Sequence, residues 1–295
     1  MSELFEGLIN DTLKDPQFLS WKNCENLALP IEEAFKICQP YLDIDFKGQF
    51  SQSFFSRLWE LYICYTLLNS SAQTFLKATK GKGPDFILEK FCEGTNIYIE
   101  CVCPQDEDPK IEKGSSIINK NYSRKEEETQ HGYVSTSQGY DDFIVSRFSN
   151  SISAKAKYFE EKYKDITKGQ YRVLCVSGAV MGSLKAKRHS SFDSYLTTEE
   201  EFKSAVCPKK YWIEKYRNFE SGPIIPEPLT IKIQKGVREP FEVGHQDYLQ
   251  TFHAIIFSDI VPFNTKAKTS GNIFTIYFNQ EAPENFRQAI GKIFY

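Results

Sequence analysis

The stretch GKGPDFILEKFCEGTNIYIECVCP, residues 81–104, holds two apolar runs, Phe86–Phe91 and Ile97–Cys103. The turn-forming cluster Glu93–Asn96 separates them, and two apolar runs around such a cluster predict a β-hairpin. A hairpin fixes which residues of its two strands lie opposite each other. These strands are therefore the part of the sheet whose pairing the sequence defines.

Each predicted strand carries one carboxylate. Asp85 stands at the start of the first strand, directly after Gly83 and Pro84, and Glu100 lies inside the second between apolar neighbours. In an antiparallel hairpin the start of the first strand lies opposite the end of the second, so we expect the two carboxylates to converge. Convergent carboxylates favour a hard divalent cation. Gly-Pro-Asp is also a common turn sequence and a strand glutamate usually faces solvent, so the metal interpretation depends on further partners.

Length, composition and charge limit the class of protein. A chain of 295 residues with 41% hydrophobic residues can bury one large core or two modest ones, which is typical of a globular protein. The net charge of −3 argues against a protein that coats nucleic acid non-specifically, but it permits an enzyme that uses a local basic cleft. The apolar runs are shorter than a membrane span, and residues 1–20 are too polar for a signal peptide. We therefore expect a cytoplasmic protein outside the membrane, and the oligomeric state stays open.

The cysteines predict buried thiols rather than a metal centre. They are scattered, and most of them lie in apolar stretches, which favours free thiols in a core. Cys101 and Cys103 form the only close pair, without a second pair or a nearby histidine that would complete a zinc site. A hydrolase that uses either thiol as nucleophile is a weaker interpretation, because strand cysteines among apolar residues are usually inert. The eight cysteines are Cys24, Cys38, Cys64, Cys92, Cys101, Cys103, Cys175 and Cys207.

The part of the chain before the hairpin is predicted to be mostly helical. Residues 1–50 show short amphipathic pieces and predict a helical cap, broken at Pro16, Pro30 and Pro40. Residues 51–68 have the clearest helical pattern, with a wide apolar face that predicts burial. On that helix Glu60 follows Arg57 at a spacing that allows a surface ion pair, which is the alternative to a functional role for Glu60. Residues 75–80 predict one more strand.

After the hairpin the pattern changes from polar to helical and then to a strand. Residues 105–141 are polar without apolar periodicity, and they predict a long loop. Residues 143–163 repeat apolar positions at helical spacing, and the apolar run 171–177 predicts a buried strand. A strand that follows a helix in this way indicates an α/β crossover with a parallel neighbour.

The C-terminal third is less regular. It predicts a short helix at 199–205, strands at 229–234, 254–257 and 273–278, and a closing helix at 283–290. The simplest organisation is an α/β protein with a central mixed sheet flanked by helices. Its parts would be a helical N-terminal cap at 1–50, a core at 51–178 that contains the 105–141 loop, and a β-rich C-terminal extension at 179–295 packed on the core.

The order of these elements and their acidic residues resembles the PD-(D/E)XK nuclease superfamily, which has the restriction-endonuclease-like fold. The resemblance covers roughly Gln52–Ser177 and rests on a helix with Glu60, then Gly83-Pro84-Asp85, then Ile99-Glu100-Cys101-Val102, then a helix and a buried strand. The later strands at 253–257 and 273–279 are similar to those of an uncharacterised bacterial branch with the same core.

The resemblance implies a metal site. Asp85 and Glu100 would bind Mg²⁺ or Mn²⁺, and Glu60 would match a helix glutamate that serves as an extra ligand or as a partner of the catalytic lysine. Magnesium keeps several waters, so one or two carboxylates and a backbone carbonyl such as that of Cys101 suffice. The bound cation would lower the pKa of a water molecule and neutralise charge on the phosphate.

The basic residues of the site depart from the superfamily pattern. The superfamily places a lysine two residues beyond the glutamate, where this chain has Val102, and valine can neither donate a proton nor neutralise a phosphate. In some branches the lysine lies on the following helix, which points to Lys155 as the fourth catalytic residue beside Glu60, Asp85 and Glu100. Arg147 on the same helix could clamp a phosphate, and Lys82 is a further phosphate-binding candidate. The alternative for these cations is a solvated helix face.

Two functions from different classes follow. The first is a divalent-metal-dependent nuclease that hydrolyses phosphodiester bonds, in DNA rather than RNA. The second is a catalytically inactive nuclease fold that serves as a binding or regulatory module. Val102 in the lysine position and the acidic net charge favour this second function.

Overall fold

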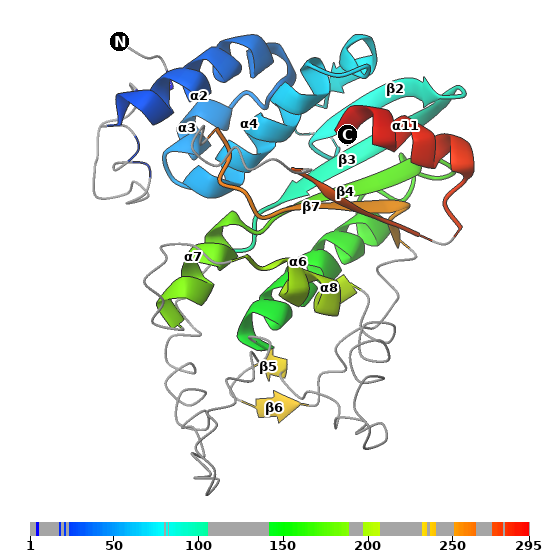
Figure 1. Cartoon of the computed structure of the whole chain (residues 1–295). Helices are drawn as coiled ribbons and strands as arrows, with labels where there is room; N and C mark the ends of the chain where they lie inside the picture. The colour runs from blue at the N-terminus through cyan, green and yellow to red at the C-terminus, as the bar shows by residue number, and fades with distance from the viewer. Residues whose placement is uncertain are drawn as a thin grey trace, which may run out of the picture.

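A six-stranded mixed sheet forms the centre of the protein (Figure 1). The computed structural model describes residues 4–5, 18, 21, 24–79, 81, 83–105, 142–188, 197–206, 232–234, 237–239, 251–263, 273–279 and 281–294. In sheet order the strands are β1 (Leu76–Ala78), β2 (Phe86–Cys92), β3 (Thr95–Val102), β4 (Tyr171–Ser177), β7 (Ala254–Ser258) and β8 (Thr275–Phe278). The two pairs β3–β4 and β4–β7 are parallel, and the other neighbours are antiparallel.

The predicted hairpin is confirmed as β2 and β3. Phe86 pairs with Ile99, so the residues just before Phe86 and just after Ile99 are neighbours across the hairpin. The reversal is tighter than the predicted turn cluster, because Glu93 and Gly94 both have positive φ angles of 49° and 84°. Two consecutive left-handed residues form the short turn that matches the twist of antiparallel strands.

The predicted crossover is also present. Helix α6 (Asp142–Glu161) lies between β3 and β4 in the chain, and the two strands are parallel neighbours. Because parallel strands need such a connection, α6 runs back along the sheet and lies against one of its faces (Figure 1). Except for Gln105, the long polar loop expected at 105–141 lies outside the described residues.

Helices cover both faces of the sheet (Figure 1). One face carries α2 (Glu25–Cys38), α3 (Phe46–Phe50), α4 (Phe54–Leu68) and α11 (Glu284–Phe294). The other carries α6, α7 (Ala179–Arg188) and α8 (Glu199–Val206). Strand β3 alternates between the two cores: Ile97, Ile99 and Cys101 belong to the first, and Tyr98 and Val102 face the second. Glu100, between Ile99 and Cys101, therefore points to the α6 face.

The break expected at Pro30 is wrong, because α2 continues through that residue to Cys38. Proline removes one backbone hydrogen bond from a helix, but burial of Ile31, Ala34, Phe35 and Cys38 holds this helix in place. The break at Pro40 is present as a 3₁₀ turn, Gln39–Tyr41, and Pro16 lies outside the described residues.

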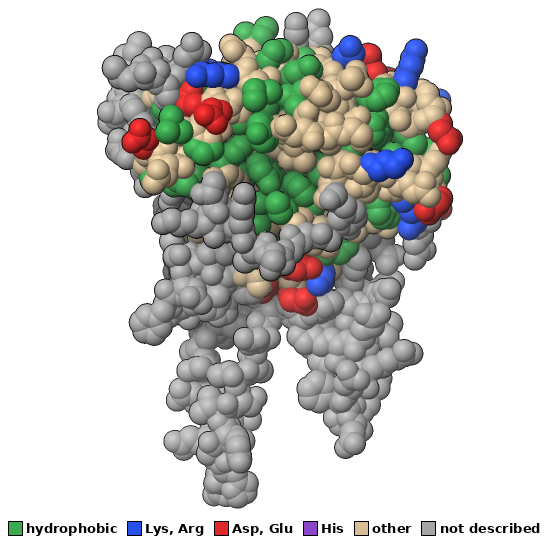
Figure 2. Space-filling model, turned by 45° about the horizontal axis from the view of Figure 1, so that its top comes forward, with side chains coloured by type: hydrophobic (Ala, Val, Ile, Leu, Met, Phe, Trp, Pro, Cys, Tyr) green, Lys and Arg blue, Asp and Glu red, His purple; other side chains and the backbone are tan. Residues whose placement is uncertain are grey.

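Figure 2 shows hydrophobic side chains reaching the surface of the molecule, with charged groups mostly toward its edges.

The C-terminal part contributes to the central sheet. Strand β7 is paired on both sides, with β4 and with β8, and all five of its residues are buried. The expected boundary at residue 178 therefore falls inside one continuous sheet. The short strands β5 (Lys232–Gln234) and β6 (Val237–Glu239) pair only with each other. Within the described ranges, no helix is long and apolar enough to cross a membrane.

Candidate functional site

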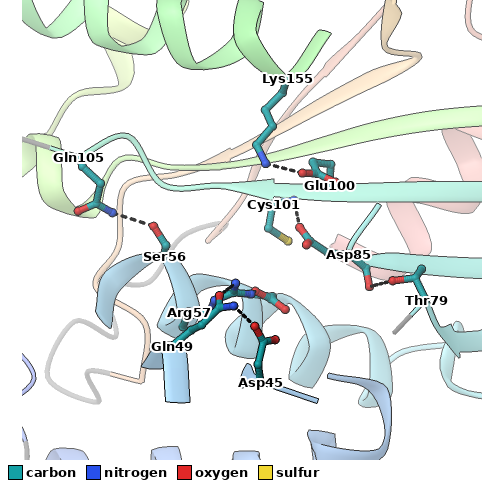
Figure 3. Close-up of polar contacts among 11 residues, drawn as sticks. Asp45, Gln49, Ser56, Arg57, Thr79, Asp85, Glu100, Cys101, Gln105 and Lys155 are labelled. Carbon is teal, nitrogen blue, oxygen red and sulfur yellow. Dashed lines mark hydrogen bonds and ion pairs between the residues drawn. The ribbon is translucent and has the colours of Figure 1, made fainter. Parts of the chain in front are cut away.

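Asp85, directly before β2, lies next to Glu100 of β3 across the hairpin (Figure 3). The amide N–H of Cys101 donates a hydrogen bond to Asp85 Oδ2, with a donor–acceptor distance of 2.6 Å. This bond fixes the carboxylate of Asp85 against the part of β3 that extends beyond the last paired residues. The convergence expected from the hairpin is therefore present.

Glu100 is paired with Lys155. The ammonium group of Lys155 reaches from α6 to Glu100 Oε1, where the two form an ion pair and a hydrogen bond (Figure 3). Glu100 is only 4% exposed, whereas 32% of the Lys155 side chain is exposed. Glu100 Oε2 is buried and has no hydrogen-bond partner among the described residues. Glu100 thus lies almost fully buried behind a lysine whose side chain is partly exposed to solvent.

Glu60 approaches the same region from α4, on the opposite face of the sheet. It is buried, and its Oε2 accepts a hydrogen bond from Arg57 Nη1 at 2.5 Å. The ion pair expected between these residues is therefore present, but Glu60 lies in the interior rather than on the surface. The other terminal nitrogen of Arg57 donates to Gln49 Oε1 on α3.

The charge of Asp85 acts on both Glu60 and Glu100. Burial, followed by the charge of Asp85, raises the pKa of Glu60 to about 8 against the opposing effect of Arg57. The same two causes raise the pKa of Glu100 to about 7, against the opposing effect of Lys155. Burial also raises the pKa of Asp85, which Lys155, the Cys101 N–H and Arg57 oppose. A site that gathers carboxylates at this cost would be stabilised by an added cation.

The donor set fits a hard divalent cation in part. Among the described residues, no three or more His, Cys, Asp or Glu side chains are close enough together to hold a metal ion. Asp85 and Glu100 nevertheless supply two carboxylates, one of them with a buried unpaired oxygen, and Mg²⁺ needs few protein ligands because it keeps its waters. The N–H and C=O of one strand residue point to the same side, so the Cys101 carbonyl faces the gap that Asp85 occupies.

Of the two phosphate-binding candidates, Arg147 does not join this cluster. Arg147 is a half-buried residue of α6, eight positions before Lys155, which corresponds to about 12 Å along the helix axis. Lys82 lies outside the described residues.

The sequence interpretation missed two tyrosines next to the site. The rings of Tyr158 and Tyr163 meet edge to face at 5.0 Å, and Lys162 Nζ donates to Tyr158 Oη at 2.9 Å. Burial, followed by the charge of Glu100, raises the pKa of Tyr163. Tyr158 follows Lys155 by three positions, and Lys162 follows Tyr158 by four, and this spacing was the available signal.

The thiols near the site are unsuited to nucleophilic catalysis. The described cysteines are free, and all of them except the half-buried Cys24 are buried. Burial raises the pKa of Cys103 to about 12 and that of Cys101 well above its usual value. Because the thiolate is the reactive form, both residues stay protonated and inert at neutral pH.

Comparison of the chain with protein-family models, with curated proteins and with solved structures finds no match. The function is therefore inferred from the residues and geometry of the site.

Proposed function

We propose that this protein is a divalent-metal-dependent nuclease that hydrolyses phosphodiester bonds, with DNA as the favoured substrate. The observation that carries the proposal is the contact between Glu100 and Lys155 beside Asp85. Two carboxylates and one ammonium group, brought together from two strands and a helix, are the groups that metal-assisted phosphodiester hydrolysis requires.

The arrangement of secondary structure supports a restriction-endonuclease-like core. Helix α4 packs on an antiparallel hairpin, a crossover helix follows, and the next strand is parallel to the second hairpin strand. The acidic residues lie at the positions that the PD-(D/E)XK pattern uses, on the helix, at the start of β2 and within β3. The pattern and the topology therefore point to the same reaction class.

Each residue has a proposed role. Asp85, Glu100 and the Cys101 carbonyl would hold Mg²⁺ or Mn²⁺, and Glu60 would be an additional ligand. When bound, the cation would lower the pKa of a coordinated water and neutralise charge on the phosphate. Lys155 holds Glu100 in place, and its remaining N–H donors can orient the attacking water and a phosphate oxygen. The protein thereby supplies orientation and charge before the reaction starts.

A nuclease and an inactive module differ in whether the site contains a catalytic ammonium group. Val102 occupies the place of the usual lysine, and its side chain faces α6. Lys155 brings an ammonium group to the same side of β3 from that helix, directly onto Glu100. This contact supports the active enzyme over the alternative, a binding or regulatory module that has lost its catalytic cation.

The test is cleavage of supercoiled plasmid and of single-stranded DNA and RNA oligonucleotides with Mg²⁺ or Mn²⁺, beside a reaction with EDTA. Asp85→Asn and Glu100→Gln keep the size of each side chain, so loss of cutting would not reflect a cavity. Lys157→Ala is the matched control, because Lys157 lies on the same helix with 73% of its side chain exposed. We expect metal-dependent cutting that both carboxylate variants lower by at least about 100-fold and the control does not change.

Other outcomes have definite meanings. Cutting that survives both carboxylate substitutions would overturn the proposal. Nucleic acid that is bound but never cut by the unchanged protein would identify the binding module. Cutting of RNA alone would correct the substrate while it leaves the reaction class in place.

A further inference from the structure

Arg57 has two sets of contacts, and only one of them involves the candidate site. Its Nη1 donates to Glu60, and its Nη2 donates to Gln49 on α3. Gln49 in turn donates from Nε2 to Asp45, which leaves its oxygen turned toward Arg57. The guanidinium carbon also lies 5.8 Å from the centre of the Phe46 ring. Residues of α3 and the turn before it thus hold Arg57 independently of Glu60.

Glu60, by contrast, depends on Arg57. It is 5% exposed, and Arg57 is its charge-opposing partner, while the negative charge of Asp85 acts against its ionisation. Removing one partner of a buried ion pair is strongly destabilising, so Glu60 needs a replacement cation or a proton wherever Arg57 leaves it. A divalent cation beside Asp85 would attract Glu60 and repel Arg57.

Asp85 lies between two cations that come from opposite sides. Figure 3 shows Lys155 reaching down from α6 and Arg57 lying on α4 below β3, with Asp85 between them. The charges of both residues act on the Asp85 carboxyl. A phosphate held next to Asp85 would therefore have Lys155 on one side and Arg57 on the other. Arg57 is partly accessible, with 19% of its side chain exposed.

We propose that Arg57 couples binding of the nucleic-acid phosphate to binding of the divalent cation, by exchanging Glu60 for the phosphate. Without substrate, Arg57 holds Glu60 and keeps its carboxylate from the cation. When a phosphodiester group arrives, the guanidinium binds it while Gln49 and Phe46 keep Arg57 in place, and Glu60 is released toward the cation. Arginine is suited to this exchange because its planar donors match a carboxylate and a phosphate equally. This inference rests on the proposed function, and it adds a regulation of the site.

Coupling of this kind is reciprocal, so it can be measured without any cleavage. The probe is a fluorescein-labelled ten-nucleotide thymidine oligonucleotide, with Ca²⁺ as an oxygen-seeking cation. Oligonucleotide affinity is measured by anisotropy with and without Ca²⁺, and Ca²⁺ affinity by calorimetry with and without oligonucleotide. We expect each ligand to tighten binding of the other by about tenfold in the unchanged protein.

The variants separate coupling from folding and from net charge. Arg57→Ala should weaken binding of the oligonucleotide and tighten binding of Ca²⁺ when no oligonucleotide is present. It should also reduce the coupling between the two ligands to less than about twofold. Arg57→Lys keeps the charge but not the paired donors, and it should retain only part of the coupling. Glu60→Gln keeps the hydrogen bond from Arg57 but cannot follow the cation, so it should also uncouple the ligands. Lys157→Ala removes one positive charge outside the site and should change nothing.

The result that overturns the inference is coupling of unchanged size in Arg57→Ala or, if that variant does not fold by circular dichroism, in Glu60→Gln. Absence of coupling or of oligonucleotide binding in the unchanged protein overturns it as well. Failure of the proposed function looks different, because there the coupling would be present and no bond would be cut.

Discussion

Lys155 of α6 and Glu100 of β3 form an ion pair across 55 positions of sequence. The pair joins the crossover helix to the strand before it, at the point where Asp85 approaches the same strand. The ammonium group thus comes from a helix rather than from the strand itself. This relationship gives the first two predictions.

Removing the ammonium should lower activity far more than stability. Lys155→Ala is expected to lower kcat by at least about 100-fold, the usual effect of losing a group that orients and transfers protons. The unfolding free energy should fall by only about 1 kcal/mol, because Lys155 is partly exposed and Glu100 can take up a proton. Plasmid cleavage and urea unfolding at pH 8 measure the two effects. Equal kcat values for variant and parent would exclude Lys155 from catalysis.

A lysine at position 102 should compensate for the loss of Lys155. Residues two apart on a strand point to the same face, so position 102 lies beside Glu100 on the α6 side. We therefore expect Val102→Lys, added to Lys155→Ala, to raise kcat by at least about tenfold over that of Lys155→Ala alone. The measurement compares kcat of the single and double variants. Val102→Met is the control for size, and restoration by methionine would contradict a role of charge.

Cation affinity should rise with pH. Without metal, Glu100 and Glu60 have pKa values raised to about 7 and about 8, so both hold protons at pH 6.5. A cation must displace those protons, and the equilibrium favours the cation as pH rises through these values. We expect Mn²⁺ to bind about tenfold more tightly at pH 8 than at pH 6.5. Calorimetry in two buffers of different ionisation enthalpy should also detect proton release, and affinity that falls with pH would contradict the assignment.

The raised pKa of Glu60 should make the metal-free protein less stable as pH rises. The folded Glu60 keeps its proton up to about pH 8, while the unfolded chain loses it near its ordinary value of 4.5. Its contribution to stability is therefore complete below pH 4.5 and is lost as pH rises through 8. Glu60→Gln should remove this pH dependence, which amounts to at most about 1.4 kcal/mol of unfolding free energy per pH unit between pH 5 and 8. Urea unfolding in EDTA measures it, with the exposed Glu161→Gln as control.

Trp59, next to Glu60 in α4, links this helix to the central sheet. Trp59 is fully buried, and its indole Nε1 donates to the Cys175 carbonyl at 2.9 Å, which ties α4 to β4. Trp59→Phe leaves that carbonyl without this donor and leaves a small cavity. We expect a loss of about 2–3 kcal/mol in unfolding free energy. Guanidinium unfolding followed by circular dichroism is the measurement. A loss below about 0.5 kcal/mol would show that the indole bond does not hold α4 against the sheet.

Local sequence predicted the elements around the site well. The hairpin follows from two apolar runs around a short polar turn, and α6 follows from its helical period. The prediction at Pro30 failed because tertiary packing outweighed a local preference. The C-terminal strands were recognised, but their place in the central sheet was not, because pairing of β7 with β4 joins segments far apart in the chain.

The sequence by itself determined which residues could form the site and that Asp85 would meet Glu100, because a hairpin fixes the partners of its own strands. Tertiary structure alone decided that Lys155 contacts Glu100 and that Glu60 is buried beside Arg57. These contacts depend on how α6 and α4 pack on opposite faces of the sheet. The shape of the whole core determines how these helices pack, and local sequence patterns do not predict it.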